Sequence, residues 1–83
     1  MTPQARQSVE HIRQELAKME AGDPAVRQHL EQLLAEIEGH FGGAENAPPR
    51  DKLAGSVSDA IRRFEVKHPA ITGWLSEIAA ALG

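Results

Sequence analysis

Apolar residues recur every three or four positions over the first quarter of the chain. They are Ala5, Val9, Ile12, Leu16 and Met19. This spacing places them on one side of a helix, in a narrow seam typical of helices that pack at shallow angles. Thr2 is placed to cap the helix, and Pro3 suits its first position, where the missing N–H costs nothing. We therefore expect an amphipathic helix from residue 3 to about residue 19.

The tetrapeptide "AGDP" at residues 21–24 ends one helix and begins another. Gly22 suits the left-handed position that follows a helix, Asp23 suits an N-cap, and Pro24 suits the first helical position. So short a connection favours an antiparallel hairpin. The second helix carries a wider apolar stripe, which predicts contact with more than one neighbour. Its members are Val26, Leu30, Leu33, Leu34 and Ile37.

The stretch "GHFGGAENAPPR", residues 39–50, is rich in glycine and proline and predicts a loop. We expect Phe41 within it to fold back onto the core. The loop divides the chain into one hairpin over residues 2–38 and another over residues 51–82. A connection of this length would also allow the hairpins to exchange between two chains.

Two further helical patterns follow the loop, at about residues 51–67 and 69–82. The first has Leu53, Val57, Ala60, Ile61 and Phe64 on one face, and the second has Ile71, Trp74, Leu75, Ile78, Ala79 and Leu82. No segment has the alternating pattern of a strand. The fold class predicted is all-α: two helical hairpins, hence four helices, packed as a small bundle in a single domain of residues 1–83, with dimerisation open.

Composition removes several classes of function. The 83 residues include no cysteine, which excludes disulfides and thiolate chemistry. No stretch approaches the ~20 apolar residues of a membrane helix, so a cytoplasmic protein is expected. The net charge is −3, and neither half of the chain is basic enough to suggest a polyanion partner. The last helix has Glu77 as its one charged residue, which argues against a DNA-recognition helix.

The stretch "FEVKHPAITGW", residues 64–74, contains Glu65 and His68 in an E-x-x-H spacing. Helical di-iron proteins use two such motifs with two further glutamates. Here the motif occurs once, and a metal-binding bundle would have to recruit His29 and Glu36. Pro69 also disfavours helical geometry at His68, which would take the pair off one continuous helical face. Glu65 and His68 stand as metal-ligand candidates, and a metal-binding bundle is the alternative function.

A structural interpretation of the same residues explains more of them. Phe64 would anchor the end of the third helix in the core. Glu65 would accept N–H groups at the start of the fourth helix, whose dipole favours a carboxylate. His68 would occupy the N-cap position, and Pro69 the first helical position. With Trp74 in the next apolar stripe, these residues form a corner that sets the angle between two helices.

The order of elements and the sequence F-E-x-x-H-P resemble a family of short bacterial proteins classed only as a domain of unknown function. The matching residues are Phe64, Glu65, His68 and Pro69, followed by the apolar stripe of the last helix. The resemblance implies a small bacterial helical protein. It transfers no activity, cofactor or site residue.

The function expected is a non-enzymatic protein–protein interaction or self-association module. The narrow seam of the first helix and the small size motivate this expectation, since small domains gain stability from association. No nucleophile elbow or glycine-rich phosphate loop is present. We expect no catalytic residue, no cofactor, no nucleic-acid or membrane partner and no small-molecule substrate. The partner would be another protein or a second copy of the chain.

Overall fold

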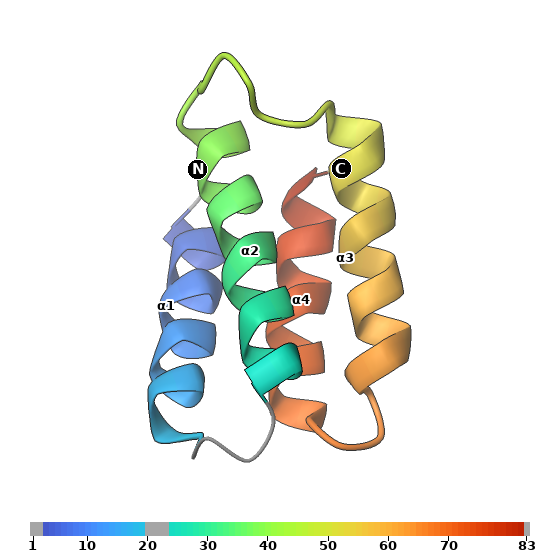
Figure 1. Cartoon of the computed structure of the whole chain (residues 1–83). Coiled ribbons are helices and arrows are strands. Elements are labelled where there is room, and N and C mark those ends of the chain that lie inside the picture. Colours follow the sequence, from blue (N-terminus) through green and yellow to red (C-terminus); the bar gives the residue numbers. More distant parts are fainter. Residues whose placement is uncertain (1–2, 20–23, 83) are drawn as a thin grey trace.

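The computed structural model describes residues 3–19 and 24–82. These residues form four helices joined in antiparallel succession (Figure 1). The helices are α1 (Pro3–Lys18), α2 (Pro24–Phe41), α3 (Arg50–Phe64) and α4 (Pro69–Leu82). The described part of the chain contains no strand, and its long dimension is 34 Å against 21 Å in the other two. The predicted all-α four-helix fold is confirmed.

Each helix has two neighbours in the bundle. α1 lies beside α2 and α4, and α3 lies beside α2 and α4, so that α1 and α3 are diagonal to one another. The closest approaches are α3 to α4 and α1 to α4. The hairpin partners α1 and α2 stand farther apart than α1 and α4 do. The closest neighbour of α1 is therefore α4 and not α2, the helix that follows it in the chain.

Side-chain size explains this asymmetry, because the distance between helix axes depends on the residues at the contact. Ala5 and Ser8 are small, and both are buried on α1. Ala79 on α4 is half-buried against the core. α2 buries four large aliphatic side chains and, unlike α1, no small one. They are Leu30, Leu33, Leu34 and Ile37.

One apolar core runs the length of the bundle and takes side chains from all four helices. The predicted stripe of α1 is buried within the chain from Ala5 to Leu16. Met19 packs against the same core at its edge. The seam that motivated self-association at the sequence level is therefore covered by the chain's own helices.

Prolines begin three helices as predicted: Pro3 opens α1, Pro24 opens α2 and Pro69 opens α4. α3 begins at Arg50, after Pro49 with φ −58° and ψ 152°. The other helix-end predictions fall outside the described residues; they concern Thr2, Gly22 and Asp23.

The expected start of the loop at residue 39 is wrong, because α2 continues through Phe41. Gly43 provides the actual stop, with φ +75°. Its N–H donates to the carbonyl of His40 at 3.3 Å, and the N–H of Ala44 donates to the carbonyl of Gly39 at 2.9 Å. These two bonds form a Schellman motif, which a left-handed glycine completes.

Gly39 has a packing role rather than a helix-ending one. A Cβ at this position would stand 3.7 Å from the Cβ atoms of Ala44 and Ala47, so the loop folds back over the last turn of α2. Phe41, as expected, packs against the core while remaining partly exposed. No helix in the described residues is long and apolar enough to cross a membrane.

Candidate functional site

The α3–α4 corner separates the two residues of the E-x-x-H motif. α3 ends at Phe64 rather than at residue 67, and residues 65–67 form a turn. The N–H of His68 donates to the carbonyl of Phe64 at 2.8 Å, which closes the turn. α4 then begins at Pro69. Glu65 and His68 are thus not on one continuous helix, in agreement with the effect of the proline.

His68 holds the N-cap position through its backbone. Its carbonyl accepts the N–H of Thr72 at 3.1 Å, the first helical bond of α4. The Thr72 hydroxyl donates to the same carbonyl at 3.1 Å. The His68 ring lies edge-on to Phe64, with centroids 6.1 Å apart. The Glu65 N–H donates to the carbonyl of Ile61 at 3.0 Å. The Glu65 carboxylate bonds no described residue, so the expected contact with the start of α4 is absent.

Phe64 is the anchor of the corner, as predicted, with 4% of its surface exposed. A second imidazole, that of His29 on α2, meets the Phe64 ring edge-on at 5.7 Å. Trp74 does not join this cluster. Its ring lies 5.2 Å from that of His11, so it covers the α1–α4 seam. The predicted corner is therefore smaller than expected and centred on Phe64.

The residues of the alternative metal site lie in two places. His29 and Glu36 line a small cavity of about 140 Å³ beside α3. Glu65 and His68 belong to the corner, where the Glu65 side chain is exposed. Among residues 3–19 and 24–82, no three or more His, Asp or Glu side chains are grouped so as to hold a metal ion.

A hydrogen bond between a buried serine and an exposed glutamate joins α1 to α4, and sequence reasoning missed it. The Ser8 hydroxyl donates to Glu77 Oε2 at 2.6 Å, and Ser8 is fully buried. Ser8 lies on the apolar seam of α1, between Ala5 and Val9, and this position could have predicted that its hydroxyl is buried. A small side chain with one hydroxyl permits close helix approach, provided that its hydroxyl finds a partner.

Arg27 of α2 supports the end of α1. Its Nη2 donates to the carbonyl of Met19 at 2.7 Å and also to the carbonyl of Leu16. A cation at a helix C-terminus satisfies carbonyls that have no partner within the helix. Because the contact comes from the next helix, the spacing of residues along the chain does not reveal it.

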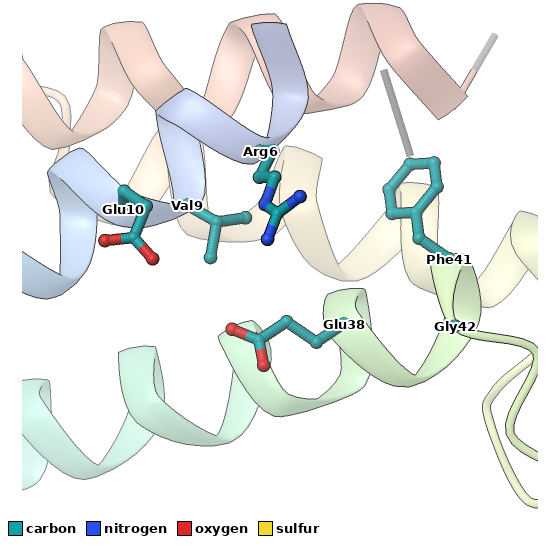
Figure 2. Close-up of a pocket in the computed structure, with 6 residues that line it drawn as sticks. All are labelled: Arg6, Val9, Glu10, Glu38, Phe41 and Gly42. Atoms are coloured by element: carbon teal, nitrogen blue, oxygen red, sulfur yellow. The ribbon is translucent and has the colours of Figure 1, made fainter. Parts of the chain in front are cut away.

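A groove lies between α1 and the end of α2, and we call it the α1–α2 groove (Figure 2). It has a volume of about 420 Å³. Its lining consists of Arg6, Val9 and Glu10 from α1 with Glu38, Phe41 and Gly42 at the end of α2. It lies between two helices that stand farther apart than α1 and α4 do.

Some charged side chains beside this groove form an ion pair and others do not. Arg13 Nε donates to Glu38 Oε1 at 2.9 Å and ties α1 to α2 at the groove's inner end. Within the described part of the chain, Arg6 and Glu10 form no ion pair. Figure 2 shows both side chains on the α1 wall, with Val9 between them and Glu38 opposite.

These features define a small antiparallel four-helix bundle with one open, charge-framed groove and one compact aromatic corner. The chain belongs to the family described as "Domain of unknown function (DUF4404)", whose model matches residues 5–83. This confirms the resemblance to a family of unknown function noted from the sequence. No curated protein and no solved structure matches the chain significantly.

Proposed function

We propose that the chain is a non-enzymatic module that acts by binding another protein, either a different partner or a second copy of itself. The α1–α2 groove carries the proposal. Phe41 gives it a partly exposed apolar side chain, while Arg6 and Glu10 bring two charges that no described residue pairs. Apolar contacts framed by polar groups are the usual composition of a protein-binding surface.

The nature of the groove favours a protein segment over a small molecule. Small-molecule sites are enclosed and mostly apolar, with few polar groups. This groove lies open along two helices and presents charges of both signs. Grooves between helices accept helices or loops of partners, whose side chains supply apolar and charged groups together.

The polar contacts of the bundle support a non-catalytic role. The hydroxyl closest to a carboxylate is that of Ser8, bonded to Glu77. A nucleophile must reach its substrate, and Ser8 is closed off between α1 and α4 with no exposed surface. The histidine rings of the corner pack against Phe64 rather than against an acid or a hydroxyl.

A capture experiment with a matched control tests the proposal. The purified chain is immobilised beside a groove variant, Arg6→Glu with Glu10→Arg. A control variant reverses an exposed pair on α3, Asp59→Arg with Arg62→Asp, whose side chains lie 3.9 Å apart. Proteins retained from a lysate of the source organism are then purified and titrated against all three chains.

The proposal predicts saturable binding to the native chain and the α3 control, with loss in the groove variant. Light scattering of the chain alone covers the case in which the partner is another copy. A chain that binds no protein in a groove-dependent way, and scatters as a monomer from micromolar to millimolar concentration, would contradict the proposal.

A further inference from the structure

Two neighbouring cavities lie on the side of α2 that faces α3 and the loop joining the two helices (Figure 1). The first has a volume of about 140 Å³ and is lined by His29, Gln32, Leu33, Glu36 and Ser56. The second has a volume of about 290 Å³ and extends toward residues 44–48. Gln32 and Glu36 line both cavities, so the two meet at these side chains.

The first cavity collects hydrogen-bond acceptors that no part of the described chain uses. Its four polar side chains form no hydrogen bond or ion pair with a described residue. A carboxylate, an amide oxygen, a hydroxyl and a neutral imidazole can each accept a hydrogen bond. Glu36 is half-buried and supplies the negative charge. The first cavity therefore suits a positively charged group that carries several donors.

The second cavity is mostly apolar. Besides the two shared residues it is lined by Ala35, Gly39, Ala44, Asn46, Ala47 and Pro48. The loop folds back closely on α2 here, because a Cβ at Gly39 would stand 3.7 Å from those of Ala44 and Ala47. Small apolar side chains thus form a surface directly beside the Glu36 carboxylate, and a short carbon chain can lie on it.

We propose that the two cavities bind an alkylammonium group, with its charged head at Glu36 and its carbon chain in the second cavity. A primary ammonium has three N–H donors and no acceptor, which matches the Glu36 carboxylate, the Gln32 amide oxygen and the Ser56 hydroxyl. The site shares no residue with the α1–α2 groove, so the inference does not rest on the proposed function.

Other occupants fit less well. An anion would be repelled by Glu36. Among the described residues no three His, Asp or Glu side chains are grouped to hold a metal ion. The first cavity is much smaller than the roughly 300–1,000 Å³ of pockets that enclose a drug-sized ligand. It therefore holds one functional group, such as the head of a free amine or of a lysine side chain.

The described cations of the chain leave this site unfilled. No lysine or arginine is among the residues that line either cavity. Lys52 lies on α3 one helical turn before Ser56, on the same side of the helix. It is exposed and pairs with no described carboxylate. The Glu36 carboxylate thus stays available for an external ammonium.

Titration of the ¹⁵N-labelled chain with n-butylammonium chloride tests the inference. The spectra are recorded at pH 7.5 and constant ionic strength, where histidine is ordinarily neutral and a primary amine is protonated. We expect saturable shifts at residues 29–36 and 44–56, with a dissociation constant on the order of millimolar. Methylammonium should bind about tenfold more weakly, because it has no carbon chain for the second cavity. Tetramethylammonium, which has the same charge and no N–H donor, should give no saturable shift.

Matched variants locate the site. Glu36→Gln should weaken n-butylammonium binding about tenfold, and Ser56→Ala about threefold. Glu65→Gln removes an equal charge at the α3–α4 corner and should leave the affinity unchanged. The groove variant Arg6→Glu with Glu10→Arg should also leave it unchanged, which separates this site from the proposed function. Circular dichroism verifies that each variant keeps its helices.

A lysine derivative distinguishes the two sources of the ammonium. Nα-acetyl-lysine methylamide that binds as tightly as n-butylammonium shows that the site accepts a lysine side chain, whereas binding of n-butylammonium alone shows a site for a free amine. Equal shifts from tetramethylammonium and n-butylammonium, or an unchanged affinity in Glu36→Gln, would overturn the inference. Neither result would affect the groove, whose own test uses different residues.

Discussion

The buried hydrogen bond between Ser8 and Glu77 gives a quantitative test of the α1–α4 seam. Ser8→Ala removes a hydroxyl that is fully buried and donates at 2.6 Å to a carboxylate. Hydrogen bonds to charged groups contribute roughly 1.5–3 kcal/mol. Glu77 is exposed and regains water, so we expect a loss below this range, about 1 kcal/mol. For a domain of this size, that lowers Tm by about 4–8 °C.

A double-mutant cycle isolates the contact. Glu77→Ala leaves the Ser8 hydroxyl without its partner, and the hydroxyl can turn back to a carbonyl of its own helix. We expect each single variant to cost about 1 kcal/mol and the double variant to cost less than their sum, by about 1 kcal/mol of coupling. Urea denaturation followed by circular dichroism measures all four free energies of unfolding.

Two further variants serve as comparisons for the Ser8–Glu77 hydrogen bond. Ser76→Ala removes an exposed hydroxyl on α4, bonded to the Thr72 carbonyl at 3.0 Å, and should change stability by less than about 0.5 kcal/mol. Ser8→Leu should cost more than Ser8→Ala, by about 1–3 kcal/mol of overpacking. A coupling between Ser8 and Glu77 within about 0.3 kcal/mol of zero would show that the hydrogen bond does not hold α1 against α4.

Three other expectations follow from the described contacts. Gly73→Ala should stabilise the bundle by about 1 kcal/mol in thermal unfolding, since nothing lies within 4 Å of the added methyl, whereas a destabilised variant would argue against a continuous α4. Gly43→Ala should destabilise it by about 1–2 kcal/mol because of the left-handed backbone, and no change would speak against the Schellman stop. Arg27→Gln should cost about 1 kcal/mol and speed amide exchange at the end of α1; unchanged exchange would remove the capping role. Elemental analysis of untagged protein should find no stoichiometric metal; bound metal that is lost in Glu65→Ala with His68→Ala would restore the alternative site.

The helices were predictable because the apolar period is regular in all four. The residues at which the helices end were harder to predict. Gly39 resembles a stop signal, yet its space is used by Ala44 and Ala47, and the real stop is the positive φ of Gly43. At the other end, residues 65–67 look like a further helical turn, although the chain has already left α3. Local residue type does not reveal whether a glycine serves packing or turning.

The sequence could not indicate which helix covers which. Periodicity shows which face of α1 is apolar, but the close pairing with α4 depends on Ser8 and its distant partner Glu77. The groove was hidden for a similar reason. Arg6 and Glu10 look like members of an ordinary solvated face, and their significance arises only from the groove beside them.

The E-x-x-H motif shows that residue types can also suggest a site that the fold does not assemble. Its residue types suggested chemistry, and the proline that follows it argued for a corner. The structure places Phe64 and the His68 carbonyl at the corner. Glu65 lies in the exposed turn of residues 65–67, after the end of α3.

The central claim, that the chain binds another protein through the α1–α2 groove, is tested most directly by the amide spectrum of the ¹⁵N-labelled chain. The spectrum is recorded from micromolar to millimolar concentration and again in the presence of a captured partner. The account predicts shifts at residues 6–10 and 38–42, caused by a second copy or by that partner, and none on the outer face of α3 near Asp59. A spectrum that changes under neither condition, or that changes mainly around Asp59, would contradict it.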